Sequence, residues 1–132
     1  MLEGSKYFAK EFMVKNNIPT AKYHKSETYE DCMSYASKLI KESGKAVLKA
    51  DTLCQGKGVF IAESLIDAED FCKKVVIEKM FGECSMVVEE YLDGFEMSLL
   101  CFVDNNTIKP LPTVKDHKKI YDGERGLNTG GM

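Results

Sequence analysis

The chain has 132 residues, of which 44% are hydrophobic, and this length suits one domain that buries a core. Lys and Arg number 18 against 21 Asp and Glu, so the net charge of -3 leaves no broad basic face for nucleic acid or anionic lipid. No apolar run approaches the roughly 20 residues of a membrane span, and the segment MLEGSKYFAK lacks the apolar core of a signal peptide. We expect a soluble, cytoplasmic protein with no nucleic-acid or membrane partner.

The first half of the chain predicts two helices and three short strands. Apolar residues recur at one-turn spacing in both helical segments, and Thr28 and Gly44 are typical of the two ends of the second helix. Asp31 stands where a capping box carries Glu. We expect helices at 5–16 and 28–43, and strands at 20–23, 46–50 and 59–63.

The second half predicts one long helix followed by strands in hairpins. Ser64 is a typical N-cap, and the apolar stripe behind it ends at Gly82. Strands are expected at 85–92, at 95–103 as the returning strand after an Asp93-Gly94 turn, and after Asn105-Asn106. This order predicts an α+β fold with helices packed on a mainly antiparallel sheet. We expect a packed core over residues 1–114 and a loop over residues 115–132.

The loop between residues 50 and 59 has the composition of a phosphate-binding turn. Phosphate recognition needs backbone N–H groups that approach the anion closely, and Gly56 and Gly58 permit this on both sides of Lys57. Lys49, in the preceding strand, has the charge to neutralise a phosphate. The pattern is not a Walker loop, because a strand and not a helix follows it. A flexible hairpin tip with solvated lysines is the alternative.

Four segments in order resemble the ATP-grasp domain of the phosphoribosylamine-glycine ligase family. They are GSKYFAKEFMVKNNIPTAKY, VLKADTLCQGKGVFIA, VVEEYLDGFEMSLLCFVD and KDHKKIYDGERGLNTGGM, and together they cover nearly the whole chain. DHK and NTGGM are the most specific parts, since the others occur more widely among ATP-grasp ligases. Two positions depart from the family: residues 52–55 replace a Gly-Leu-Ala-Ala run, and Leu127 replaces a proline.

The resemblance implies an ATP-dependent ligase of purine biosynthesis. ATP would phosphorylate glycine, and the amine of 5-phosphoribosylamine would displace phosphate to give glycinamide ribonucleotide and ADP. It also implies that residues 1–132 are a partial ATP-grasp domain, the nucleotide-binding fragment of a longer parent polypeptide, and inactive alone. Mg²⁺ is the expected second cofactor, with ligands beyond Met132 and none assigned within the chain.

The same resemblance assigns the site residues. Lys6 and Lys49 would contact the α- and β-phosphates. The loop of residues 55–58, called the flap below, would cover the triphosphate. Glu89 would accept from the adenine amino group, the backbone of the next three residues would read the adenine edge, and Glu96 would bind the ribose. The remaining assignments are the flap (Gln55, Gly56, Lys57, Gly58), the adenine-reading backbone (Glu90, Tyr91, Leu92), the reacting centre (Asp116, His117, Lys118) and the glycine or phosphoribosylamine site (Asn128, Thr129, Gly130, Gly131).

Several alternatives stay open. Another ATP-grasp ligase, such as a carboxylase or a carbamoyl-phosphate enzyme, would share the lysines and the flap, and a non-catalytic nucleotide-binding module would keep the fold alone. His117 fits a surface loop as well as a general base.

The five cysteines show no metal or redox spacing, so we expect reduced thiols, with Cys32 and Cys72 packed as small hydrophobes. Cys54 lies between Lys49 and Lys57, where cations favour the thiolate, and should be alkylated first.

Overall fold

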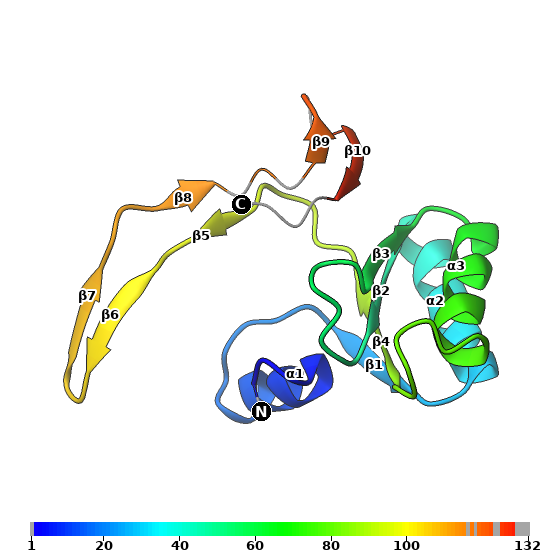
Figure 1. Ribbon diagram of the computed structural model, residues 1–132, viewed down its shortest axis with the longest axis horizontal. Helices are drawn as coiled ribbons and strands as arrows, with labels where there is room; N and C mark the ends of the chain where they lie inside the picture. The colour runs from blue at the N-terminus through cyan, green and yellow to red at the C-terminus, as the bar shows by residue number, and fades with distance from the viewer. Residues whose placement is uncertain (1, 116, 118, 123–124, 129–132) are drawn as a thin grey trace. The chain divides into compact units, whose positions relative to one another are not determined.

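The computed structural model describes residues 2–115, 117, 119–122 and 125–128, and it divides into two compact units, Met1–Leu92 and Asp93–Met132. The first unit is built on a four-stranded sheet in the order β1-β4-β2-β3, in which every neighbouring pair is antiparallel. Two helices cover one face of this sheet, and a third lies on its other side (Figure 1). The elements are α1 (Lys6–Lys15), β1 (Tyr23–Ser26), α2 (Tyr29–Ser43), β2 (Ala46–Ala50), β3 (Val59–Ala62), α3 (Leu65–Cys72), η1 (Lys73–Ile77) and β4 (Met86–Glu90).

Side-chain caps begin the three helices α1, α2 and α3. The hydroxyls of Ser5, Thr28 and Ser64 each accept a hydrogen bond from the backbone N–H three residues further on. Gly44 ends α2 in the left-handed conformation, with φ of 80°. The carboxylate of Asp31, the residue at the capping-box position, binds Nε2 of His24 at 2.9 Å. The predicted helical segments are therefore confirmed, although the third is completed by the π-helix η1.

The core lies between the sheet and the pair α2 and α3. Alternate residues of β2 face these helices, and Leu48 is fully buried beside Met86 and Val88 of β4. Phe60 of β3 stacks on Phe71 of α3 with ring centroids 5.2 Å apart. The intervening residues of β2 and β4 point to the opposite face of the sheet, which carries the charged groups described below.

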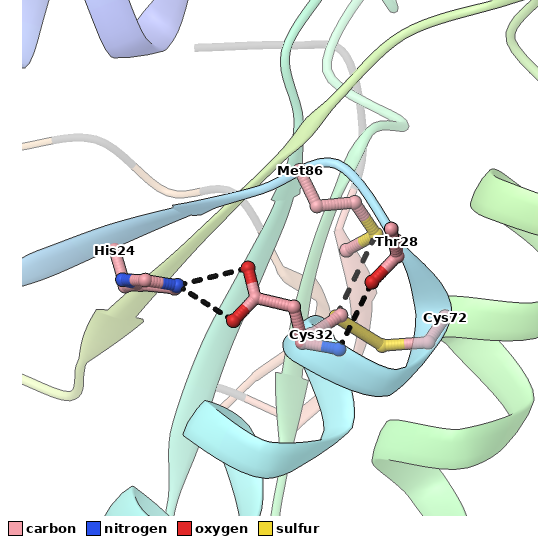
Figure 2. The surroundings of a disulfide bond; sticks show 6 residues. His24, Thr28, Cys32, Cys72 and Met86 are labelled. Carbon is pink, nitrogen blue, oxygen red and sulfur yellow. Dashed lines mark hydrogen bonds and ion pairs between the residues drawn. A yellow bond between two sulfur atoms is a disulfide. The ribbon is translucent and has the colours of Figure 1, made fainter.

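Cys32 and Cys72 correct the expectation of reduced thiols. Both are fully buried, and the structure joins them in a disulfide between α2 and the end of α3, with Cα atoms 6.9 Å apart (Figure 2). The sulfur of Cys32 also lies 4.0 Å from that of Met86. Each cysteine occupies the apolar stripe of its helix, as predicted. Their proximity results from the packing of the two helices, which residue spacing does not reveal.

The second unit consists of three two-stranded antiparallel pairs in the residues described. They are β5 (Met97–Ser98) with β8 (Val114–Lys115), β6 (Cys101–Asp104) with β7 (Thr107–Pro110), and β9 (Lys119–Tyr121) with β10 (Arg125–Asn128). The turn at Asn105-Asn106 is confirmed. The expected return of residues 95–103 onto β4 is wrong, because β5 and β6 pair within this unit.

Two further observations concern the second unit. The β9–β10 hairpin lies within residues 115–132. Residues 93–115 are exposed throughout, and the buried hydrophobic residues in the described part of the chain belong to the first unit. Over the described residues, the model contains no helix with the length and apolar character that crossing a membrane requires.

Candidate functional site

A carboxylate and two lysines form a charged cluster on the sheet face that α2 and α3 leave uncovered. Glu89 of β4 lies opposite Val47 of β2, and Lys49 follows two residues later on β2, on the same face of the sheet. Its Oε1 is 2.9 Å from Nζ of Lys49, and its Oε2 is 2.7 Å from Nζ of Lys10 in α1. The side chains of Glu89 and Lys10 are 4% and 9% exposed, whereas that of Lys49 is 25% exposed. Lys49 is thus the member of the cluster that reaches the surface.

Lys10 is a site residue that the sequence analysis missed. Its ammonium donates to Oγ1 of Thr20 at 2.8 Å and to the carbonyl of Ala21 at 3.5 Å, and it lies 5.7 Å from the ring centroid of Tyr23. The pKa of the Tyr23 phenol is raised to about 12, because the phenol is partly buried and donates a hydrogen bond to Glu11. The spacing of four residues between Lys6 and Lys10 places both on one face of α1, and this was the available signal.

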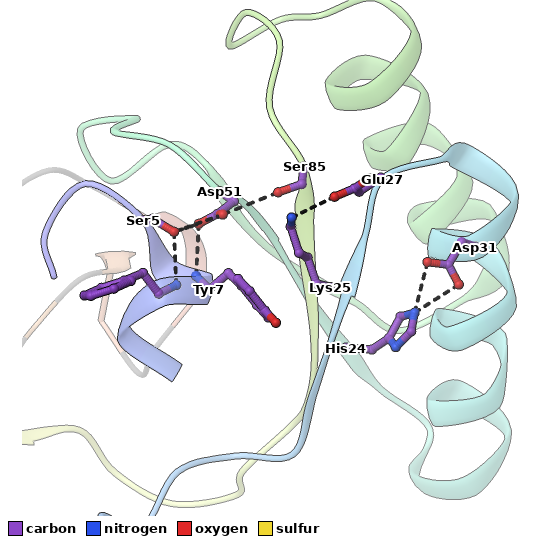
Figure 3. A network of polar contacts seen from close by, with 9 residues as sticks. Ser5, Tyr7, His24, Lys25, Glu27, Asp31, Asp51 and Ser85 are labelled. Atoms are coloured by element: carbon purple, nitrogen blue, oxygen red, sulfur yellow. Dashed lines mark hydrogen bonds and ion pairs between the residues drawn. The ribbon is translucent and has the colours of Figure 1, made fainter. Parts of the chain in front are cut away.

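The first turn of α1 holds the start of the loop at residues 51–58. Lys6 donates from Nζ to the carbonyls of Ala50 and Thr52, each at 2.7 Å. Between them, the carboxylate of Asp51 accepts from Oγ of Ser5 and the backbone N–H of Tyr7, both at 3.0 Å (Figure 3). Asp51 also accepts from Oγ of Ser85 at 3.3 Å. Lys6, predicted to contact phosphate, binds backbone carbonyls at the start of this loop.

Asp51 gives a test of this connection. Asp51→Ala should lower the free energy of unfolding by roughly 1–3 kcal/mol, since it leaves several donors of the first turn of α1 without an acceptor. Amide hydrogen exchange at the start of α1 should accelerate in the same variant. Asp70→Ala removes an exposed carboxylate that forms an ion pair with Lys74, one helical turn away, and should change stability by less than about 0.5 kcal/mol. Equal effects of the two variants in urea unfolding would contradict the role of Asp51.

The loop turns sharply at its glycines. Gln55 and Gly56 have φ values of 50° and 82°, and the N–H of Lys57 donates to the carbonyl of Cys54 at 3.0 Å. The N–H of Ala50 donates to the carbonyl of Gly58 at 2.8 Å and closes the base of the loop. Gly58 is buried, whereas residues 55–57 are exposed. A Cβ atom at Gly58 would clash with Sγ of Cys54 and lie 2.6 Å from its Cβ.

The three other cysteines differ in exposure. Cys101 is exposed, whereas Cys54 and Cys84 are half-buried. Burial, followed by the neighbouring Cys54 and the charge of Asp51, raises the pKa of the Cys84 thiol. Because Cys101 is more exposed than Cys54, we expect Cys101 to be alkylated first, instead of Cys54 as the sequence indicated.

Alkylation followed by mass spectrometry tests this order. We expect Cys101 to be labelled first and Cys54 second. Cys84 should be labelled last and only at higher pH, because its raised pKa keeps the thiol protonated until the pH approaches that value. Nucleotide should protect Cys54 alone. Protection of Cys101 without protection of Cys54 would argue against nucleotide binding over this loop.

The other predicted residues belong to both units. Oε1 of Glu90 accepts from the backbone N–H of Lys22 at 2.8 Å, and the Tyr91 ring centroid lies 4.9 Å from Nζ of Lys45. Leu92 is exposed in the first unit, and Glu96 and His117 are exposed in the second. Asn128 ends β10. Asp116, Lys118, Thr129, Gly130 and Gly131 lie outside the described residues.

Comparison with known proteins identifies the family. Residues 4–132 match the family model of the phosphoribosylglycinamide synthetase ATP-grasp (A) domain. The chain belongs to this family. The ATP-grasp fold and the α+β class predicted from the sequence are confirmed by this match and by the helices and antiparallel sheets of the first unit.

Relatives of this ATP-grasp domain are longer proteins. The chain is 44% identical to a phosphoribosylamine–glycine ligase of Streptococcus pyogenes, over 99% of the chain and 31% of the relative. It is 43% identical to a bifunctional purine biosynthetic protein of Dictyostelium discoideum, of which it spans 16%. The crystal structure of a phosphoribosylamine–glycine ligase from Thermotoga maritima superposes with a TM-score of 0.85 at 41% identity, over 99% of this chain and 33% of that one. The chain therefore spans a third or less of these relatives.

Proposed function

We propose that this chain is the nucleotide-binding part of a phosphoribosylamine-glycine ligase. The observation that carries the proposal is the identity of 41–44% to proteins of that name over 99% of the chain. The whole protein would use ATP to convert the carboxylate of glycine into an acyl phosphate. The amine of 5-phosphoribosylamine would then attack the acyl carbon and expel phosphate, giving glycinamide ribonucleotide, ADP and phosphate. A cytoplasmic location is part of the proposal.

Lys49 is the proposed clamp on the nucleotide phosphates. A carboxylate becomes open to attack only after phosphorylation, and phosphoryl transfer depends mainly on positioning and on stabilising charge. Lys49 provides a partly exposed cation, and its contact with the buried Glu89 holds it in place. The exposed tip of the loop, Gln55–Lys57, would close over the phosphates, while Lys6 keeps the base of that loop attached to α1.

Glu89 has an acceptor suited to its predicted partner. Within the described part of the chain, its Oε1 accepts no hydrogen bond, although it faces the Lys49 ammonium. That oxygen can accept from the amino group of adenine, but it is buried behind Lys49, so the Lys49 side chain would have to move aside for the base to reach it. The backbone of Glu90 to Leu92 would read the adenine edge and Glu96 the ribose. Asp116, His117 and Lys118 would serve the reacting centre, and Asn128–Gly131 would serve glycine or phosphoribosylamine.

Mg²⁺ does not fit the carboxylates next to Lys49. Glu89 is paired with two ammonium groups, and Asp51 accepts from the first turn of α1. Over the described residues there is no group of three or more acidic, His or Cys side chains with the arrangement of a metal site. No step of the proposal passes through a metal held by these residues.

The test is ADP formation by the protein that carries this sequence. The proposal predicts that ADP release requires both glycine and 5-phosphoribosylamine. ADP release that requires a different carboxylate or amine would favour another ATP-grasp ligase. Nucleotide binding without turnover under any of these conditions would favour a non-catalytic module. Titration of the 132-residue chain with ATP, followed by calorimetry, measures its nucleotide binding separately.

A further inference from the structure

The cluster of Lys10, Lys49 and Glu89 carries one more positive charge than negative charge. Two ammonium groups face one carboxylate, one at each of its oxygens, at 2.7 and 2.9 Å. A buried carboxylate with a single lysine would form a neutral pair, and that pair would attract an anion only weakly. Because a second lysine contacts Glu89, the cluster of two lysines and one carboxylate retains a formal net charge of about +1.

The surplus charge is available at Lys49 and not at Lys10. The ammonium of Lys10 has three N–H donors, and it faces Glu89, Thr20 and the carbonyl of Ala21 at 2.7, 2.8 and 3.5 Å. Its side chain is only 9% exposed, so no ligand reaches it without displacing these groups. Lys49 is 25% exposed and shares its carboxylate with Lys10.

We propose that Lys10 is a positioning residue that neutralises Glu89, so that Lys49 keeps a full positive charge for a polyphosphate ligand. This inference rests on the proposed function, because it concerns the same nucleotide site. The proposal gives Lys10 a role that requires no direct contact with the ligand. Burial of an unpaired ammonium is unfavourable. The pairing with Glu89 therefore explains how α1 can bury a charged side chain against the sheet.

The inference predicts a dependence on ligand charge that a purely structural role would not produce. Lys10→Gln keeps a hydrogen-bond donor for Thr20 and removes the charge. Its affinity for inorganic tripolyphosphate should fall by about tenfold, roughly the effect of one partly buried charge near an anion. Its affinity for ATP should fall to a similar extent, and its affinity for adenosine by less than about twofold.

A second substitution should restore the charge balance. Lys10→Gln/Glu89→Gln removes one positive and one negative charge, so the cluster keeps the single positive charge of Lys49. Tripolyphosphate affinity should therefore return to within about threefold of the wild-type value. Lys73→Met removes one positive charge from an exposed pair with Glu69, and is the matched control with unchanged affinity. Thermal unfolding of each variant shows whether it is folded. Lys10→Met is the second neutral variant should Lys10→Gln not fold.

Calorimetric titration of the 132-residue chain with tripolyphosphate decides the matter. Loss of affinity in Lys10→Gln and recovery in the double variant would support the inference. Unchanged affinity in folded Lys10→Gln, or continued loss in the double variant, would overturn it. Absence of tripolyphosphate binding by the wild-type chain would also overturn it. The proposed ligase function is judged separately, by glycine-dependent ADP release from the protein that carries the sequence.

Discussion

Lys49→Met should weaken ATP binding to this chain by roughly 100-fold, while the free energy of unfolding changes by less than about 1 kcal/mol. Lys49 supplies the partly exposed charge of the cluster, so its loss removes the charge-assisted contact with phosphate. The fold should tolerate the change because Glu89 keeps its contact with Lys10 at 2.7 Å. Calorimetric titration with ATP and urea unfolding measure the two quantities.

Lys73→Met is again the matched control, since it removes the same charge from the exposed surface of η1. Its ATP affinity should equal that of the wild-type chain. If Lys49→Met bound ATP as tightly as this control, Lys49 would not contact the phosphates. The GKG loop would then be the solvated hairpin tip that its composition alone also allows.

Gly58→Ala should lower the free energy of unfolding by roughly 1–3 kcal/mol and also weaken ATP binding, because the new methyl group has no space. It would clash with Sγ of Cys54 and lie 2.6 Å from the Cβ atom of that residue, so the loop backbone must move. Cys54→Gly/Gly58→Ala removes both obstructing atoms and should recover ATP affinity in part. Urea unfolding and ATP titration of the single and double variants test this.

Gly44→Ala is the control for Gly58→Ala. A Cβ at Gly44 meets no atom within 4 Å, but its φ of 80° disfavours alanine. It should therefore cost about 1 kcal/mol of stability at the end of α2 without a change in ATP affinity. If Gly58→Ala bound ATP normally, or if the double variant bound no better than the single one, the close packing of Gly58 against Cys54 would have no bearing on the site.

Local signals predicted most of the first unit. The caps at Thr28 and Ser64 and the strand at 46–50 depend on neighbouring residues and on alternation, and the structure places them as expected. The strand expected at 20–23 is found at Tyr23–Ser26, since its register is set by pairing with β4. Lys49 was also a candidate phosphate-binding residue from sequence, because it precedes a glycine-rich turn, and that role stays a prediction.

The missed features depend on contacts between distant segments. Lys10 acquires its role from Glu89 in β4, and Asp51 acquires its role from the first turn of α1. The disulfide of Cys32 with Cys72 similarly depends on the packing of two helices. Alternation in residues 95–103 identifies strands but carries no information on their partners, which explains the wrong pairing with β4. The boundary between packed core and loop, and the roles of the site residues, remain predictions.

The most direct experiment compares ADP release by the protein that carries this sequence with ADP release by its Lys49→Met variant, with glycine and 5-phosphoribosylamine present together and singly. A phosphoribosylamine-glycine ligase with Lys49 on the ATP phosphates should release ADP only when both substrates are present, and the variant should lose this activity. ADP release that is independent of glycine, or that persists at the wild-type rate in Lys49→Met, would contradict it.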